Sequence, residues 1–293
     1  MKNPKKAFRR LVCFGLDRPG TRWLLAAIAT WYARRATGKD VSIFYDEFWI
    51  HRIEDRFLSD FPLFNYYGSD ICSWGTPDEA YVNDAADYWF YRYSPRPGHV
   101  IIDIGAGVGT DVHAFSKAVG PTGRVLALEA HPTTFLGLVK TCKWNRLDNV
   151  ICEQVAVMDK PGTVDIQDSD DDKSNATGTG SGKTVRVASV TLDQLCEKHG
   201  IRQIDFLKIN IEGAERWALL GMERVLRNTA SIAVACHDFR AQRGDGDHFA
   251  TLDFVRPFLQ SNGFNLETRD TDQRPYVRDH IHGRRSLVSH EGA

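Results

Sequence analysis

Three closely spaced glycines in the middle of the chain are the residues best suited to bind a ligand. Gly105, Gly107 and Gly109 follow the apolar run 99–104 and precede a segment with helical character. Because glycine has no Cβ, the backbone can turn sharply there and a ligand can approach the main chain closely. A strand, a glycine loop and a helix in this order predict a cofactor-binding turn. A glycine-rich turn without a ligand is the alternative.

An acidic residue ends the next predicted strand. Glu129 stands twenty residues after Gly109 and closes the run 124–129. A carboxylate in this place can accept hydrogen bonds from both hydroxyls of an adenosine ribose. We therefore expect a cofactor that contains adenosine.

The spacing of the glycines separates two classes of such cofactors. A dinucleotide site has the pattern G-x-G-x-x-G, whereas residues 105–109 have the pattern G-x-G-x-G. Asp103 also stands two residues before the first glycine, where its carboxylate would disfavour a pyrophosphate but tolerate a positively charged sulfonium nucleoside. We predict S-adenosylmethionine as the cofactor and keep a nicotinamide dinucleotide as its rival.

Candidate catalytic side chains follow two later strands. His237 comes directly after the apolar run 231–236, so it should lie at the same edge of the sheet as the glycine loop and could act as a base. Glu212 and Glu215 follow the run 205–211 and could orient an acceptor hydroxyl or His237. The competing interpretations are a histidine hydrogen-bonded at a strand end and acids that favour a helix N-terminus.

The elements that must position these residues alternate between strands and helices from about residue 98 onward. Helical spacing marks residues 133–146, and Thr191 with Gln194 forms a capping box. This alternation predicts an α/β fold, doubly wound around a mostly parallel sheet. The runs typical of strands buried on both faces are 99–104, 124–129, 149–157, 205–211, 231–236 and 264–269.

Several segments carry weaker signals. The polar stretch 168–184 predicts a mobile loop between runs that could pair as a hairpin, and Thr177 stands where a phosphate loop needs glycine. His280 and His282 lie in an apparent short tail and lack a third metal ligand at a suitable spacing. The six cysteines contain no C-x-x-C pair, so neither a disulfide framework nor a zinc site is indicated.

The beginning of the chain is strongly basic. Residues 1–39 contain ten lysines and arginines against one acid, Asp17, although the net charge of the chain is -1. Such a segment could contact a membrane surface or another anionic partner, or be a solvated tail. The apolar run Trp23–Trp31 is too short to span a bilayer and predicts a short helix. No secretory signal and no nucleic-acid motif is evident, so we expect a cytoplasmic protein without a nucleic-acid partner.

Aromatic residues are concentrated between positions 43 and 93. Thr76 and the two residues after it, Pro77 and Asp78, have the pattern of a helix start, and the predicted helix runs through about Tyr93. Aromatic stretches more often pack a core than bind a ligand, although they also stack on sugar rings. We expect residues 1–75 to form an α-helical, aromatic-rich extension and residues 76–293 to form the cofactor-binding domain.

Taken together, several motifs resemble the FkbM-type methyltransferases, a family within the class I S-adenosylmethionine-dependent group. The resemblance covers roughly residues 79–270, and its most specific part is Asp205–Met222, in which a strand is followed by EGAE and a helix. It implies a seven-stranded class I sheet with the cofactor across its switch point. The motifs are DIGAGVGT, GPTGRVLALEAHP, WNRLDNV, VTLDQL and DFLKINIEGAERWALLGM.

The resemblance also implies a set of cofactor-binding residues. Asn210 stands where the family usually has Asp; its amide can still hydrogen-bond the cofactor's amino group but brings no charge. The missing carboxylate argues against magnesium, so we expect no metal. The other residues are Gly105, Ala106, Gly107 and Thr110 near the methionine part, Glu129 at the ribose with Ala130 beside it, and Ala156 bordering the adenine.

The expected activity is O-methylation of a hydroxyl on a glycan or on a glycosylated or polyketide-type metabolite. The resemblance, and not the spacing of residues, supplies this acceptor class. An N-methyltransferase and a non-catalytic cofactor-binding module remain as alternatives on the same fold, the second because of Asn210. The oligomeric state is left open.

Overall fold

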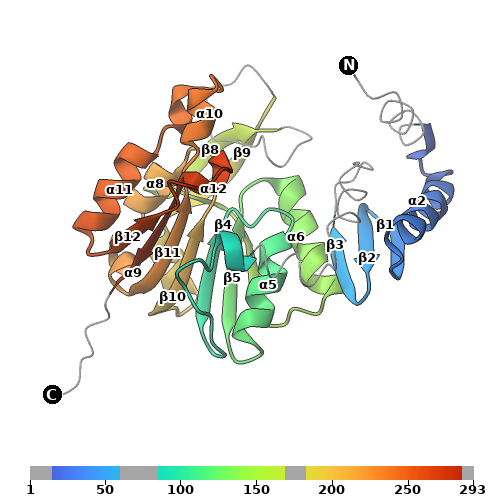
Figure 1. The fold of residues 1–293 in the computed structure, drawn as a ribbon, viewed down its shortest axis with the longest axis horizontal. Helices are drawn as coiled ribbons and strands as arrows, with labels where there is room; N and C mark the ends of the chain where they lie inside the picture. The colour runs from blue at the N-terminus through green and yellow to red at the C-terminus, as the bar shows by residue number, and fades with distance from the viewer. Residues whose placement is uncertain (1–14, 60–84, 169–182, 286–293) are drawn as a thin grey trace.

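The computed structural model describes residues 15–59, 85–168 and 183–285, which build a central sheet with helices on both faces (Figure 1). The sheet has seven strands in the order β12-β13-β11-β10-β4-β5-β6. Strands β11, β10, β4, β5 and β6 are parallel, and β13 runs antiparallel to both of its neighbours. The predicted α/β class, with a doubly wound and mostly parallel seven-stranded sheet, is confirmed.

The strand order reverses between β4 and β10. From β4 the chain proceeds outward through β5 and β6, and it then returns to place β10 and β11 on the other side of β4. A crevice opens outside the carboxyl ends of the strands at such a switch point. The strands of the sheet are β4 (Val100–Ile104), β5 (Arg124–Glu129), β6 (Val150–Gln154), β10 (Ile204–Ile209), β11 (Thr229–Ala235), β12 (Asn265–Thr268) and β13 (His280–Arg284).

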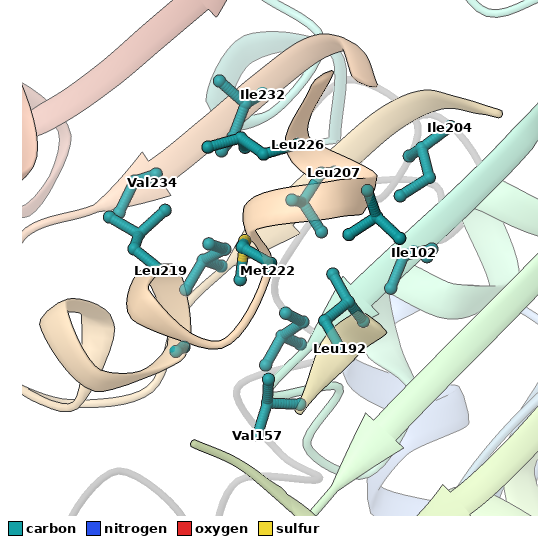
Figure 2. Packing of buried hydrophobic residues seen from close by; sticks show 14 of the residues in the cluster. Ile102, Val157, Leu192, Ile204, Leu207, Leu219, Met222, Leu226, Ile232 and Val234 are labelled. Carbon is teal, nitrogen blue, oxygen red and sulfur yellow. The ribbon is translucent and has the colours of Figure 1, made fainter. Parts of the chain in front are cut away.

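Short helices cover one face of the sheet with a continuous apolar layer. Leu219 and Leu226 from these helices pack with Leu207 and Ile232 from the strands, and all four side chains are buried (Figure 2). Thr191 and Gln194 form the predicted capping box at the start of the first helix. The helices of this face are α7 (Leu192–Lys198), α8 (Glu215–Leu220), α9 (Glu223–Arg227) and α11 (Leu252–Ser261).

Two helices cover the other face. These are α5 (Thr110–Val119) and α6 (Pro132–Trp144), whose buried residues include Phe115 and Leu138. Helix α6 matches the predicted helix at 133–146, and His131 caps it by accepting a hydrogen bond from the backbone of Thr134. The remaining short helices of the domain are α10 (Asp238–Gln242), the 3-10 helix η2 (Asp247–Phe249) and α12 (Pro275–Arg278).

The predicted strand at 149–157 is wrong in its extent, because the chain divides there between two sheets. Strand β6 pairs with β5, whereas Ala156–Val157 (β7) pairs with Thr184–Val190 (β9) in a separate three-stranded sheet of order β7-β9-β8. The third strand, Gly162–Gln167 (β8), pairs antiparallel with β9, which confirms the predicted hairpin. Residues 169–182 of the predicted mobile loop lie outside the described residues.

The apparent tail around His280 is in fact the internal strand β13. His280 and His282 are buried beneath the segment that contains Trp89 and Tyr91, whereas Ile281 packs into the opposite apolar layer. The sequence did not predict this strand because two of its five residues are histidines, which look polar. The strand also runs antiparallel and lacks the apolar run of its parallel neighbours.

The helix predicted to run from Thr76 to about Tyr93 ends earlier than expected. Its start lies outside the described residues, and its last helical residues are 85–88. The backbone amides of Trp89 and Phe90 both donate to the carbonyl of Ala85, which closes the helix there. Two prolines shortly downstream in the sequence also disfavour its continuation.

The described part of the N-terminal extension contains the expected helix and also an antiparallel sheet that the sequence did not reveal. Helix α2 (Arg22–Thr37) packs on β1 (Val41–Asp46) and β2 (Phe48–Ile53), and β3 (Arg56–Ser59) completes the sheet. The boundary proposed between residues 75 and 76 lies outside the described residues.

Helix α6 joins this extension to the cofactor-binding domain. The side chain of Asn145 accepts a hydrogen bond from the backbone amide of Phe57 at 2.9 Å and donates one to the carbonyl of Phe57 at 2.6 Å. Trp144 stacks on Phe57 with 5.2 Å between ring centroids and meets Phe44 edge-on. Many aromatic residues of the extension therefore pack a core, as the sequence favoured.

The position of β13 inside the sheet can be tested by mutation. Ile281→Ala should lower the free energy of unfolding by about 2–5 kcal/mol, because it leaves a cavity in the apolar layer. Leu136→Ala on the solvent side of α6, where Leu136 is 53% exposed, is the matched control and should change it by less than about 0.5 kcal/mol. Equal denaturant midpoints for the two variants would show that residues 280–284 are not an internal strand.

Candidate active site

A cavity of about 780 Å³ opens at the carboxyl ends of β4, β5, β10 and β11, at the switch point of the sheet. Ten of the residues predicted from the sequence to form the site line it. Asp103, Gly109 and Glu215 do not. The ten are Gly105, Ala106, Gly107, Thr110, Glu129, Ala130, Ala156, Asn210, Glu212 and His237.

The glycine loop is held against β5 by main-chain hydrogen bonds. The backbone amides of Gly105 and Ala106 both donate to the carbonyl of Leu128, at 2.9 and 3.0 Å. Gly105 has a φ of 79°, and a Cβ added there would lie 1.9 Å from the carbonyl oxygen of Asn210. Only glycine fits where the loop passes so close to the end of β10.

Glu129 contacts the glycine loop and also lines the cavity. Its carboxylate accepts hydrogen bonds from the backbone amides of Gly107 at 3.0 Å and His131 at 2.9 Å. Burial raises the pKa of Glu129 to about 7, although those two amides oppose the rise. A carboxylate that lines the cavity and is fixed in this way can accept hydrogen bonds from ribose hydroxyls.

Asp103 does not reach the cavity as predicted, because it lies inside the sheet and pairs with Lys208. The Nζ atom of Lys208 is 2.7 Å from Oδ1 of Asp103 and donates to the carbonyl of Gly105 at 2.9 Å. Burial alone would lower the pKa of Lys208, but Asp103 and the more distant Asp111 outweigh it and raise that pKa. Lys208 is therefore a permanent cation beneath the glycine loop.

Asp111 occupies the position near the cavity that was predicted for Asp103. It lines the cavity, and one of its carboxylate oxygens lies 3.6 Å from the Nζ atom of Lys208. It stands in the first turn of α5, a location that suits an acidic side chain. Sequence reasoning missed both Asp111 and Lys208, although a charged residue within the apolar run 204–209 was a visible signal.

The segment after β10 presents Asn210 and Glu212 to the cavity. Glu212 adopts a φ of 51°, which is uncommon for a residue with a side chain. Gly213 follows with a φ of 98°, and a Cβ there would approach the carbonyl oxygen of His248 to 2.9 Å. Strained backbone of this kind concentrates at functional sites, where the surrounding structure holds it in place.

His237 lies between two carboxylates of the EGAE segment. Its Nδ1 is 2.9 Å from an oxygen of Glu215, and its Nε2 is 3.3 Å from an oxygen of Glu212. Burial favours the neutral ring, but Glu215 and then Glu212 outweigh it and raise the pKa of His237 to about 10. The two carboxylates therefore favour the imidazolium form of His237, in which neither ring nitrogen can accept a proton, and its role as the base stays a prediction.

Glu212 is the ionised member of this cluster that borders the cavity. Burial alone would raise the pKa of Glu212, but contacts with His237 and Arg240 outweigh it and lower that pKa. Arg240 thus forms an ion pair with Glu212. Glu215 is fully buried at the start of α8, where it also accepts a hydrogen bond from the backbone amide of Gly213.

An aromatic wall that sequence reasoning did not assign lines part of the same cavity. Trp89 stacks on His280 with 4.9 Å between ring centroids and lies 5.0 Å from the Nζ atom of Lys208. Burial lowers the pKa of His280 to about 3, so this second histidine of the cavity is neutral. The other aromatic residues that line the cavity are Tyr88, Phe239 and Tyr276.

The arrangement fits S-adenosylmethionine. Glu129 can hold the ribose, the glycine loop leaves room for the cofactor beside the main chain, and the cavity is large enough for a nucleoside with an amino-acid tail. In the part of the chain that the structure describes, no group of three or more His, Cys, Asp and Glu side chains is arranged to hold a metal ion. The absence of a metal requirement stays a prediction.

A sheet of this strand order, with a glycine loop and an acidic residue at its switch point, has the architecture of a class I S-adenosylmethionine-dependent methyltransferase. Residues 103–266 match the Methyltransferase FkbM domain, which is more than half of the chain. The chain belongs to this family, and its cofactor is S-adenosylmethionine.

The sequence identity between this chain and individual relatives is low. The chain is 25% identical over 183 residues to the 2-O-methyltransferase NoeI of Sinorhizobium fredii, an alignment that covers 56% of this chain and 73% of NoeI. Among solved structures it is similar to a methyltransferase FkbM of Methylobacillus flagellatus KT, with a TM-score of 0.43 and 13% identity over 77% of this chain and 62% of the other. Fibrillarin of Aeropyrum pernix, solved with S-adenosyl-L-methionine, has a TM-score of 0.42 and 15% identity over 83% and 97% of the two chains.

The raised pKa of Glu129 predicts pH-dependent cofactor binding. Ribose hydroxyls donate hydrogen bonds to the ionised carboxylate. The affinity for the cofactor should therefore reach its maximum above a pH of about 7 and fall as the pH drops below it. Titration calorimetry with S-adenosylhomocysteine should show about tenfold weaker binding at a pH of about 6 than at about 8. Glu129→Gln should bind weakly and lack this difference, and the cofactor's own amino group titrates alike in both proteins. An unchanged pH dependence in Glu129→Gln would contradict the assignment.

The close approach of Gly105 to Asn210 makes a second prediction. Gly105→Ala should lower the free energy of unfolding by more than about 2 kcal/mol and abolish measurable cofactor binding, because the loop must move away from β10. Gly38→Ala is the control, since Gly38 also has a positive φ, of 70°, but lies in the left-handed region that a side chain can adopt and has open space around it. This control substitution should lower the free energy of unfolding by only about 1 kcal/mol and leave cofactor binding intact. Similar losses in both variants would mean that backbone conformation alone, and not the contact, constrains Gly105.

Proposed function

We propose that this methyltransferase transfers the methyl group of S-adenosylmethionine to a hydroxyl of a glycan or of a glycosylated or polyketide-type metabolite. The observation that carries the proposal is the combination of an ionised carboxylate, Glu212, with an aromatic wall in one cavity. A carboxylate can accept the proton of a hydroxyl, and aromatic rings stack on the apolar faces of sugars. The similarity to NoeI, a 2-O-methyltransferase, supports the same reaction.

Bound S-adenosylmethionine supplies a methyl group that is already activated on a sulfonium, so the protein has to position the acceptor and remove one proton. In our proposal Glu129 holds the ribose, and Gly105, Ala106, Gly107, Thr110 and Asn210 surround the amino-acid part. Ala130 and Ala156 border the nucleoside.

Glu212 accepts the hydrogen bond of the acceptor hydroxyl and then its proton. His237 acts as a positioning residue, because its two ring nitrogens fix Glu212 against the buried carboxylate of Glu215. Its positive charge also keeps Glu212 ionised when no acceptor is bound. An N-methyltransferase would not need this carboxylate in the same way, since an unprotonated amine already carries a nucleophilic lone pair.

Substitution of Glu212 tests the proposal. Cell extracts rich in glycans and glycosylated metabolites, incubated with methyl-labelled cofactor, should give a product whose label NMR places on an oxygen atom. The unmethylated form of that product is the acceptor. With this acceptor, Glu212→Gln should lower kcat at least about 100-fold while cofactor binding is retained. Glu223→Gln, which changes an exposed acid at the start of α9, is the control and should match the wild type.

The pH profile separates the roles of Glu212 and His237. With Glu212 as the proton acceptor, kcat at saturating cofactor should be flat between a pH of about 6 and about 9. A rate that rises about tenfold per pH unit across this range would identify His237 as the base. Labelled nitrogen in the product would instead establish the N-methyltransferase, and cofactor binding without any labelled product would favour a non-catalytic module.

A further inference from the structure

Helix α2 directs apolar side chains to solvent as well as to the core. Leu25 and Ala33 are buried against β1 and β2. On the opposite side, Leu24, Ile28 and Trp31 follow one another at spacings of four and three residues, which places them on one exposed face.

Two tryptophans dominate that exposed surface. Trp23 is 70% exposed and Trp31 is 67% exposed, and Tyr32 also lies open to solvent. We call Trp23, Leu24, Ile28, Trp31 and Tyr32 together the outer face of α2. Exposed apolar side chains this large and this close together on one helix mark an interaction site rather than scattered surface residues.

The charge around the outer face is positive. Arg18 and Arg35 are exposed at the two ends of α2, and Arg34 beside them pairs with Asp40 at 3.1 Å. Residues 1–39 carry ten lysines and arginines against a single acid. That acid, Asp17, lies 2.7 Å from Arg22 and accepts a hydrogen bond from Trp49, so its charge is directed into the extension.

We propose that the outer face of α2 binds the surface of an anionic lipid bilayer, with the helix lying parallel to the membrane plane. Tryptophan and tyrosine have an apolar body and a polar tip, which suits them to the headgroup region. Arginines beside them attract anionic headgroups while their aliphatic stems contact apolar surface.

The helix is suited to lie on a membrane and not to cross it. Sixteen residues extend about 24 Å, less than the hydrocarbon core of about 30 Å. Among the residues the structure describes, no helix is both long and apolar enough to span a membrane. The choice of lipid over a second copy of the chain rests on charge, because two copies of this basic face would repel each other. The inference does not depend on the acceptor of the methyl group.

Vesicle sedimentation with the full chain tests the proposal. The protein should sediment with phosphatidylcholine vesicles that contain about one third phosphatidylglycerol, and far less with pure phosphatidylcholine or at high salt. The double variant Trp23→Ala/Trp31→Ala should show an at least about tenfold lower partition coefficient. Arg35→Glu should show a similar loss through charge reversal alone.

Trp217→Ala is the matched control, because Trp217 is an exposed tryptophan on α8 and is 43% exposed. It should bind vesicles like the wild type, and far-UV circular dichroism should show that all variants are folded. No sedimentation of the wild type with anionic vesicles would overturn the proposal, as would equal binding by the double variant. A wild-type dimer in light scattering that the double variant abolishes, without vesicle binding, would assign the outer face to contact between copies.

Discussion

The buried ion pair between Lys208 and Asp103 holds together the two strands that form the switch point. Two opposite charges inside the sheet are stable only because each satisfies the other, and removing one partner of such a pair typically costs about 3–5 kcal/mol. Lys208 also donates to the carbonyl of Gly105, so the same cation that joins β10 to β4 fixes the start of the glycine loop. The position of the cofactor loop thus depends on a contact beneath it.

The cavity places its charges in separate regions around this fixed loop. On the β5 side, Glu129 is held by backbone amides and lines the space to which we assign the ribose. On the β11 side, Glu212, Glu215 and His237 form a compact cluster in which one cation lies between two carboxylates. The geometry favours a division in which one side binds the nucleoside and the other handles the proton of the acceptor.

Helix α6 connects the cofactor edge to the N-terminal extension. At its start, the backbone amide of His131 donates to Glu129, and after its end Asn145 pairs with the backbone of Phe57 in β3. Apolar and aromatic packing along its length makes this a rigid connection. The outer face of α2 is therefore tied to the catalytic domain through folded structure on both sides of α6.

The sequence alone determined the features that depend on local pattern. Apolar runs separated by helical spacing set the parallel strands, and because such strands share their carboxyl edge, Gly105, Glu129 and His237 could be placed together before the structure was known. The motif Asp205–Met222 added the family. The capping box at Thr191 and the pairing of β8 with β9 also follow from neighbouring residues.

Tertiary structure decided what depends on residues far apart in the chain. The charge of His237 is set by Glu215, 22 positions away, and the docking of the extension is set by contacts 88 positions apart. Strand β13 has a polar sequence, and only burial under Trp89 makes it internal. Asp103 was predicted to contact the cofactor because a carboxylate beside a glycine loop suits a sulfonium. In the structure it pairs instead with Lys208 on the neighbouring strand β10. Local patterns specify elements, whereas burial and long-range pairing specify charge.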